Sequence, residues 1–218
     1  MGSKKIFFVT GIDTDAGKSI VTGTLARELA RQGEKVITQK FIQTGCHDIS
    51  EDIETHRRIM GIELLPEDRN GTTCPLIFSY PASPHLAAEM ESAVIDTGKI
   101  AECSRRLHEK YDIILLEGAG GLLAPVSPDY LTIDYIKEHG LPVILVTSPR
   151  MGSINHTLLS LEACRAKDIF VHAIVYDIYF QTNNIITDDT RKYFKYYLSK
   201  YHPCTKFMEI DGEMRLYE

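Results

Sequence analysis

The sequence has no long hydrophobic run, no secretory leader and no excess of basic residues. None of its apolar stretches approaches the roughly twenty residues that cross a bilayer, and its N-terminus lacks an apolar core followed by a cleavage site. We therefore expect a cytoplasmic protein with no membrane partner. Lysine and arginine total 24 residues against 30 of aspartate and glutamate, and they form no stripe, so we expect no nucleic-acid partner either.

The sequence also has no close spacing of cysteines or histidines. Its five cysteines are dispersed without a Cys-x-x-Cys pair, which indicates free thiols rather than disulfides or a zinc site. The eight histidines show no metal-ligand spacing, and we interpret His56 and His85 as surface or packing residues. No internal repeat or linker divides the chain, so residues 1–218 are predicted to fold as a single domain around one core.

A glycine-punctuated segment lies between a predicted strand, residues 6–10, and a predicted helix, residues 20–32. It begins at Gly11 and ends in Gly17-Lys18-Ser19. In such a loop the backbone N–H groups and the dipole of the following helix favour a phosphate chain. Lys18 would reach the outer phosphate oxygens, and the Ser19 hydroxyl would complete the shell of a bridging Mg²⁺.

The spacing of this loop departs from the standard P-loop, which has four residues between its glycines. Gly11 and Gly17 are separated by five, so the strict pattern fails. An ordinary strand-to-helix turn with a surface lysine is the alternative. That alternative leaves the acidic motifs further along the chain unexplained, and we therefore favour nucleotide binding.

The rest of the chain alternates strand and helix patterns. A second strand is predicted over residues 34–39, and continuous apolar runs at 113–116, 143–146 and 170–175 are typical of strands covered on both faces. Helical patterns follow at 53–60, 100–110, 154–167 and 188–201, and the chain then ends in a short tail. The alternation predicts an α/β fold of the P-loop NTPase type, with a parallel sheet and helices on both faces.

Polar residues follow several of these strands, where open α/β sheets bind their ligands. Lys40, Glu117 and the pair Tyr176-Asp177 are expected at the same edge as the P-loop. Glu117 is the strongest candidate for a carboxylate ligand of Mg²⁺, because Gly118-Ala119-Gly120 lets the backbone approach a phosphate closely. Spacing alone does not choose the second carboxylate from Asp48, Glu51, Asp52 and Glu54.

Lys40 would be a second cation beside the loop. Two lysines and a metal around one triphosphate suit phosphoryl transfer, in which catalysis is mostly positioning and charge stabilisation. A lysine at a strand end is more often solvated, but this location favours a catalytic role.

Taken together, these residues resemble the dethiobiotin synthetases. The segment Gly11-x-Asp13-Thr14-x-x-Gly17-Lys18-Ser19 is similar to that family's variant P-loop, including its five-residue spacing. The other motifs in the family's order are Lys40 with Thr44-Gly45, Glu51-Asp52, Ser83-Pro84-His85, Glu117-Gly118-Ala119-Gly120-Gly121, Pro142-Val143-Ile144-Leu145-Val146 and Gly152-x-Ile154-Asn155-His156. The resemblance covers residues 5–177.

The resemblance implies an ATP- and Mg²⁺-dependent ligase that closes the ureido ring of dethiobiotin from 7,8-diaminononanoate and CO₂, the latter drawn from bicarbonate. In the family, one amine of the substrate is carbamylated and the carbamate oxygen attacks the γ-phosphate of ATP. The second amine then displaces phosphate from the carbamic-phosphoric mixed anhydride. By position, Lys18 and Lys40 would stabilise the carbamate and the phosphoryl group, Thr14 would contact both, and Thr44 would hold the diamine.

The resemblance also implies the ligands of the metal and the nucleotide. It assigns Mg²⁺ to Ser19, Asp52 and Glu117, which selects Asp52 among the four acids. The implied nucleotide-binding residues are Asp15, Ala16, Gly17, Lys18, Ser19, Ile20, Asp52, Glu117, Gly118, Ala119, Gly120, Tyr176 and Asp177.

The family works as a homodimer in which the substrate tail reaches the partner subunit. The resemblance therefore places Gly152, Ser153 and Asn155 at a helix N-terminus to receive the substrate carboxylate, with assistance from Tyr193. From the residues alone, Tyr193 in its aromatic-rich helix is a packing or interface residue.

Two departures from the family's pattern concern its loops and its base site. Phe41 replaces the proline that often follows the catalytic lysine, which would alter only the loop. Tyr176 stands where many members have the asparagine that reads adenine, and the Pro-x-Leu segment that holds the base in those members is missing. We hypothesise that base selection is relaxed or depends on stacking by Tyr176.

Two other functions are compatible with a P-loop fold. Regulatory ATPases of the partition and septum-positioning type carry a signature lysine where this chain has Asp13, and they often end in a basic amphipathic helix that this sequence does not show. Amide-forming ligases on cobyrinate-like substrates usually add a glutaminase domain, for which 218 residues leave no room.

Overall fold

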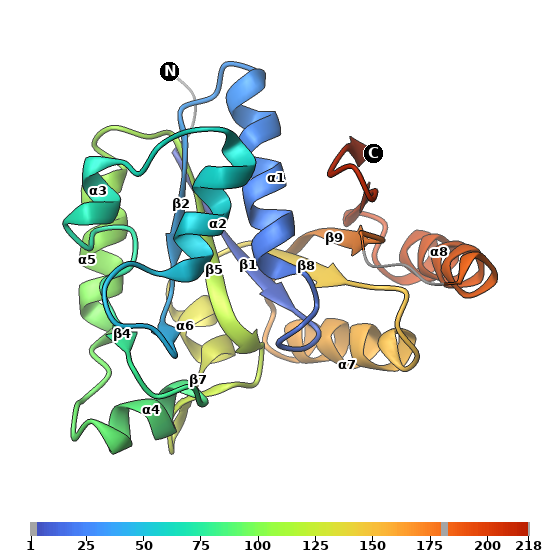
Figure 1. The fold of residues 1–218 in the computed structure, drawn as a ribbon. Helices are drawn as coiled ribbons and strands as arrows, with labels where there is room; N and C mark the ends of the chain where they lie inside the picture. Colours follow the sequence, from blue (N-terminus) through green and yellow to red (C-terminus); the bar gives the residue numbers. More distant parts are fainter. Residues whose placement is uncertain (1–3, 180–182, 218) are drawn as a thin grey trace.

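A computed structural model describes residues 4–179 and 183–217 as a sheet with helices on both faces (Figure 1). The helices are α1 (Lys18–Arg31), α2 (Glu51–Met60), α3 (Pro66–Arg69), α4 (Pro84–Met90), α5 (Thr97–Leu107), α6 (Thr132–Glu138), α7 (Ser153–Ala166) and α8 (Asn184–Tyr201). The strands are β1 (Lys5–Gly11), β2 (Val36–Lys40), β3 (Gln43–Thr44), β4 (Ile77–Phe78), β5 (Ile113–Gly121), β6 (Pro125–Ser127), β7 (Tyr130–Leu131), β8 (Val143–Thr147), β9 (Val171–Asp177), β10 (Lys206–Ile210) and β11 (Leu216–Tyr217).

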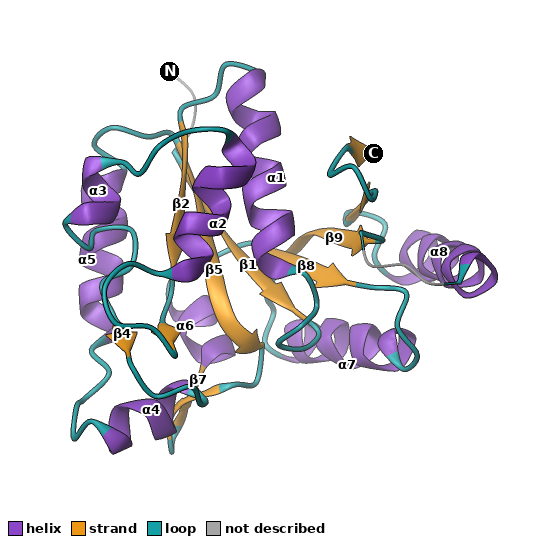
Figure 2. Ribbon diagram, viewed as in Figure 1, coloured by secondary structure: helices purple, strands orange, loops and turns teal. Residues whose placement is uncertain are grey.

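The main sheet has seven strands in the order β11-β10-β9-β8-β1-β5-β2. All neighbours pair in parallel except β10 and β11, which are antiparallel. Figure 2 shows the helices that connect these strands on the two sides of the sheet. The predicted α/β fold of the P-loop NTPase type is confirmed.

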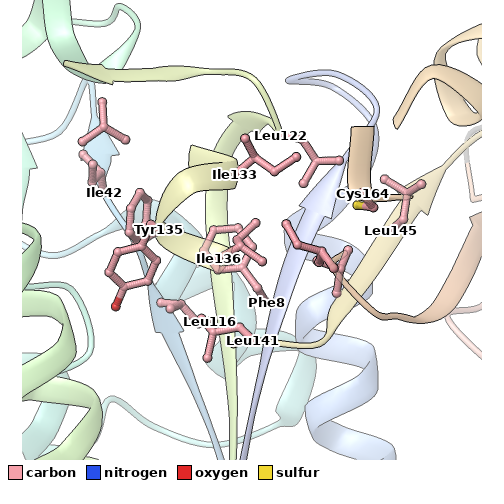
Figure 3. Packing of buried hydrophobic residues seen from close by; sticks show 14 of the residues in the cluster. Phe8, Ile42, Leu116, Leu122, Ile133, Tyr135, Ile136, Leu141, Leu145 and Cys164 are labelled. Carbon is pink, nitrogen blue, oxygen red and sulfur yellow. The ribbon is translucent and has the colours of Figure 1, made fainter. Parts of the chain in front are cut away.

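Alternate residues of the central strands enter two separate cores, because successive side chains of a strand point to opposite faces. Val9 and Leu115 pack with α1 on one face. Phe8 and Leu116 pack on the other face with residues of α6 and α7, including Tyr135 and others drawn in Figure 3. Burial on both faces explains why the central strands read as continuous apolar runs.

The structure differs from the sequence prediction at the C-terminus. Residues after α8, predicted as a short tail, form β10 and β11 and extend the main sheet beyond β9. Met208 and Ile210 alternate into the core on the α1 face, so the segment is held by burial as well as by pairing.

Strand β5 is also longer than predicted. The apolar run was expected to end before Glu117, but pairing continues to Gly121, which is in register with Gly11 of β1. Glu117 therefore lies within the strand, opposite Val9 on one side and Lys40 on the other.

Among the described residues, no helix is long and apolar enough to span a bilayer.

Candidate functional site

The loop between β1 and α1 ends at a glycine, and any other residue at this position would displace neighbouring atoms. Gly17 has φ of +90°, a conformation that side chains rarely adopt. A Cβ atom on Gly17 would also lie 1.9 Å from Oδ2 of Asp177 at the end of β9. The turn into α1 is thus packed directly against Asp177, which brings two of the predicted nucleotide-binding residues together.

Lys18, the first residue of α1, folds its side chain back over this loop. Its Nζ donates to the carbonyl oxygens of Asp13 at 2.8 Å and Thr14 at 2.9 Å. Burial lowers the pKa of Lys18 to about 8, and the charge of Lys40 acts in the same direction, while the carboxylates of Glu117 and Asp52 offset only part of the shift. An anionic phosphate placed beside Nζ would stabilise the ammonium form.

Four side chains from separate elements converge next to Lys18. Ser19 comes from the first turn of α1, Asp52 from the first turn of α2, and Lys40 and Glu117 from paired positions of β2 and β5. Ser19 Oγ lies 2.7 Å from Asp52 Oδ1 and 3.0 Å from Glu117 Oε1. Lys40 Nζ donates to Glu117 Oε1 at 2.9 Å and also contacts Asp52 Oδ2.

The charges in this cluster hold one another ionised. Burial alone would lower the pKa of Lys40, but the carboxylates of Glu117 and Asp52 outweigh it and raise that pKa well above its usual value. Burial likewise acts to raise the pKa of Glu117, and Lys40 and His56 hold it well below its ordinary range. Glu117 is 0% exposed, so its charge depends on these partners.

Helix α2 carries Asp52 to the cluster through a defined start. The Ser50 side chain accepts a hydrogen bond from the N–H of Ile53, and three acidic residues occupy the first turn, where the helix dipole favours them. The helix is capped after Met60 by Gly61, which has φ of +71°. Asp52 is thus held at the site, whereas Asp48 precedes the helix.

The segment that follows α2 supports Lys40 from the side. The backbone N–H of Lys40 donates to the carbonyl of Thr73 at 2.7 Å. Arg57 of α2 is buried and holds the carboxylate of Asp68 through two bonds of 2.8 Å, and it also donates to Thr38 of β2. This buried arginine fixes the 66–76 segment against β2. The turn-rich sequence of that segment did not indicate such a contact.

His56 was interpreted as a surface or packing residue, but the structure places it in the cluster. Its ring is fully buried, and Nε2 lies 2.7 Å from Glu117 Oε2. The available signal was its position four residues after Asp52, since residues four apart share one face of a helix. His85, interpreted in the same way, lies partly exposed in the first turn of α4.

A cavity of about 720 Å³ opens on one side of the P-loop. Thr14 and Thr44, both predicted to contact the substrate, line it, and so do Ala119 and Gly120 of β5. Its remaining walls come from residues 11–13, 81–84 and 121–124 and from α7, including His156. Polar side chains such as Thr14 and apolar side chains such as Leu122 both line the cavity.

A second cavity of about 370 Å³ lies on the other side of the P-loop. Asp15 and Ala16 line it together with Arg150, Asp177 and Asn183. Burial raises the pKa of Asp177 to about 6, against the effect of a hydrogen bond from the N–H of Tyr179. Arg150 also donates to Asp13 at 2.7 Å, a contact across the loop that the sequence did not predict.

The hypothesis that Tyr176 stacks on a base is wrong. Its side chain is 0% exposed, lies edge-on to Phe194 of α8 and donates to the carbonyl of Thr187 at 3.1 Å. The alternation of β9 explains the error, because Asp177 and Tyr176 point to opposite faces. Only Asp177 faces the P-loop.

The residues predicted to receive a substrate carboxylate are not among those that line either cavity, although the adjacent Met151 and His156 line the second and the first. Gly152, with φ of +89°, precedes the first turn of α7, which contains Ser153 and Asn155. Ser153 is buried, with Oγ 3.4 Å from the hydroxyl of Ser148. Tyr193 lies on α8, 38% exposed and stacked on Tyr197.

The donor set at the cluster suits a hard divalent cation. Two carboxylates and one hydroxyl converge, and oxygen donors of this kind are what Mg²⁺ prefers, with phosphate and water oxygens completing its shell. Within residues 4–179 and 183–217 there is no group of three His, Cys, Asp or Glu side chains that could hold a metal ion by themselves.

Comparison with known proteins gives several close relatives. The AAA domain family matches residues 5–184. The protein named ATP-dependent dethiobiotin synthetase BioD 2 of Pasteurella multocida is 54% identical over 207 residues, which cover 95% of this chain and 97% of that protein. The corresponding protein of Haemophilus ducreyi is 53% identical over 96% and 99% of the two chains, and BioD of Chlorobaculum tepidum is 50% identical over 90% and 82%.

Solved structures with a similar fold are much more distant in sequence. The hydrogenase maturation factor HypB from Archaeoglobus fulgidus has a TM-score of 0.55 at 15% identity, covering 96% of this chain and 82% of that one. The signal recognition particle receptor FtsY from Elizabethkingia anophelis has a TM-score of 0.54 at 13% identity, and the match spans 63% of its length. These likenesses concern the fold alone.

Proposed function

Because the chain belongs to the family of ATP-dependent dethiobiotin synthetases, it is an ATP-dependent ligase of biotin biosynthesis, and we propose how its residues carry out the reaction. The observation that carries the proposal is the convergence of Ser19, Asp52, Glu117 and Lys40 beside the P-loop lysine. The reaction closes the ureido ring of dethiobiotin from 7,8-diaminononanoate and CO₂. Its chemistry is a phosphoryl transfer followed by displacement of phosphate.

The triphosphate of ATP is proposed to lie along the P-loop at the start of α1. Gly17 lets the backbone turn toward the phosphates, and the N–H groups of the first turn of α1 face them. Lys18 would exchange its carbonyl partners for phosphate oxygens. Ser19, Asp52 and Glu117 would hold Mg²⁺, which when bound supplies positive charge between the phosphate groups.

The diamine is proposed to occupy the larger cavity, with its amines near Thr14 and Thr44. One amine takes up CO₂ to form a carbamate, and the carbamate oxygen attacks the γ-phosphorus as the bond to ADP breaks. The second amine then attacks the carbamate carbon, and phosphate leaves as the ring closes. Filling of the cavity by the diamine would displace water, which would otherwise hydrolyse the mixed anhydride.

Lys40 is proposed to stabilise the carbamate and the transferring phosphoryl group. An ammonium has three N–H donors, and those of Lys40 are directed to Asp52, to Glu117 and to the carbonyl of Gly118 at 3.1 Å. Lys40 can therefore contact the substrate only by exchanging one of these partners. The exchange accelerates the reaction if the new contact is stronger in the transition state than in the ground state.

The smaller cavity is proposed to receive the base of the nucleotide. It lies directly beside Asp15 and Ala16 of the P-loop, and Asp177 offers carboxylate oxygens there as acceptors for an exocyclic amino group. Turnover with ATP, GTP and CTP at equal concentration tests the related proposal of relaxed base selection. A strict preference for ATP would contradict that part.

The protein is further proposed to act as a cytoplasmic homodimer. Support comes from the position of Gly152, Ser153 and Asn155, which lie at a helix start outside the cavity walls of their own chain. In a dimer they could receive the carboxylate of a diamine bound by the partner subunit, with Tyr193 nearby. Sedimentation equilibrium measures the dimer, and a monomer that is fully active would overturn this proposal.

The test of the whole proposal is the dependence of ATP hydrolysis on the two co-substrates. We expect turnover only when both 7,8-diaminononanoate and bicarbonate are added, with one ADP and one phosphate released for each dethiobiotin formed. Omission of Mg²⁺ should abolish it. Hydrolysis that proceeds at the same rate without the diamine would contradict the proposed mechanism.

A further inference from the structure

Helix α2 directs two side chains, one turn apart, at the same carboxylate cluster. Asp52 lies in its first turn, and His56 follows four residues later on the same face. The His56 ring is 0% exposed, and its Nε2 lies 2.7 Å from Oε2 of Glu117. Because a carboxylate oxygen can only accept, Nε2 is the donor in this bond.

The two oxygens of Glu117 therefore face different partners. Oε1 lies 3.0 Å from Ser19 Oγ and 2.9 Å from Lys40 Nζ, on the side of the P-loop. Oε2 is bound by Nε2 of His56. A carboxylate held by one oxygen cannot rotate freely about its last bond, so the other oxygen keeps a fixed direction.

We propose that His56 is a positioning residue, which binds Oε2 of Glu117 so that Oε1 points at the metal–phosphate site. The inference rests on the proposed function, since it takes Glu117 to be a ligand of Mg²⁺. Carboxylates that bind metals are commonly oriented by such an outer hydrogen bond, and its loss typically weakens metal binding about 10–100-fold.

The surroundings of His56 argue against a role in packing alone. Among the residues that the structure describes, its Nδ1 has no hydrogen-bond partner, so Glu117 is the one polar group that the ring engages. Helix α1 approaches the backbone of α2 here, and a Cβ on Gly23 would lie 3.2 Å from the His56 Cα. For packing alone, an apolar side chain at position 56 would leave no unsatisfied nitrogen.

Four variants separate orientation from packing. His56→Leu keeps the bulk and removes the donor, whereas His56→Gln places an amide N–H near the position of Nε2. Ile59→Ala is the matched control, because Ile59 is a buried residue of the same helix that packs against Gly23 of α1 and has no polar group to offer Glu117. Glu117→Gln removes the proposed metal ligand.

The direct measurement is binding of Mn²⁺, as a paramagnetic substitute for Mg²⁺, to the protein with the β,γ-imido analogue of ATP, followed by electron paramagnetic resonance. We expect His56→Leu to raise the Kd for Mn²⁺ about tenfold or more, and His56→Gln to restore most of that loss. Ile59→Ala should lower the Tm yet bind Mn²⁺ like the wild type. In turnover, the Mg²⁺ concentration for half-maximal rate should rise in His56→Leu.

The outcomes distinguish the positioning role of His56 from the proposal that Glu117 binds the metal. If Glu117→Gln loses Mn²⁺ binding while His56→Leu binds like the wild type, the metal site stands and the positioning role is overturned. Equal losses in His56→Leu and Ile59→Ala, or no recovery in His56→Gln, would also overturn it. If Glu117→Gln binds Mn²⁺ like the wild type, the metal assignment itself fails and the inference fails with it.

Discussion

Replacement of Lys40 by methionine tests the charge balance of the cluster most sharply. The lysine ammonium is 5% exposed and its partner Glu117 is 0% exposed, so the change would leave a buried carboxylate without its main counter-charge. Removal of one partner from such a buried pair typically costs about 3–5 kcal/mol of unfolding free energy. His56 and Ser19 still bind Glu117, which places the expected loss at the lower end of that range.

The pH dependence of this loss has a definite sign. In the wild type the pKa of Glu117 lies well below its usual value, so its ion pairs stabilise the fold above the unfolded pKa, and that stability is lost as pH falls through the folded pKa. In Lys40→Met the burial of Glu117 is no longer offset, and its pKa rises. The penalty relative to the wild type should therefore be largest at neutral pH and should shrink as the solution is acidified.

Urea denaturation of the wild type, Lys40→Met, Glu117→Gln and the double variant gives the coupling directly. The double variant holds no buried charge at either position, so we expect its loss to be smaller than the sum of the two single losses. In activity assays Lys40→Met should reduce kcat about 10²–10³-fold with little change in nucleotide affinity. Additive stability losses would refute the ion pair, and parallel losses of kcat and nucleotide affinity would reduce Lys40 to a nucleotide-binding residue.

Three further predictions concern the P-loop and the buried arginine. Gly17→Ala should abolish nucleotide binding, measured by calorimetry, because its Cβ would meet the carboxylate of Asp177 at 1.9 Å; binding at wild-type affinity would contradict this. The pKa of Lys18 is lowered to about 8, so affinity for the ATP analogue should fall as pH rises above that value, and Lys18→Arg should show no such fall. Arg57→Met should cost about 3–5 kcal/mol in urea denaturation by leaving buried Asp68 unpaired, and a loss below about 1 kcal/mol would refute that role.

Much of the fold could be predicted because its signals are local. The apolar runs of the central strands follow from burial on both faces, and Gly17-Lys18-Ser19 identifies the start of α1. The C-terminal strand was missed because a five-residue segment becomes a strand only by pairing with β9, and nothing in the sequence shows that this edge is open.

The site was predictable in part. Lys40 and Glu117 could be placed because carboxyl ends of parallel strands share one edge of a sheet. The error at Tyr176 was avoidable, since a period of two along β9 puts Tyr176 on the face of Ile174 and Asp177 on that of Val175. The placement of His56 in the cluster depends on the approach of α2 to β5. This is a long-range contact, and the four-residue spacing from Asp52 only suggests it.

The most direct measurement is a crystal structure of the protein with the β,γ-imido analogue of ATP, the diamine and Mn²⁺, with the metal located by its anomalous scattering. We predict one Mn²⁺ coordinated by Ser19, Asp52 and Glu117 beside the phosphates, with Lys40 in hydrogen-bond contact with the γ-phosphate or the diamine. A metal bound away from both carboxylates, or a triphosphate away from Lys18, would contradict the account.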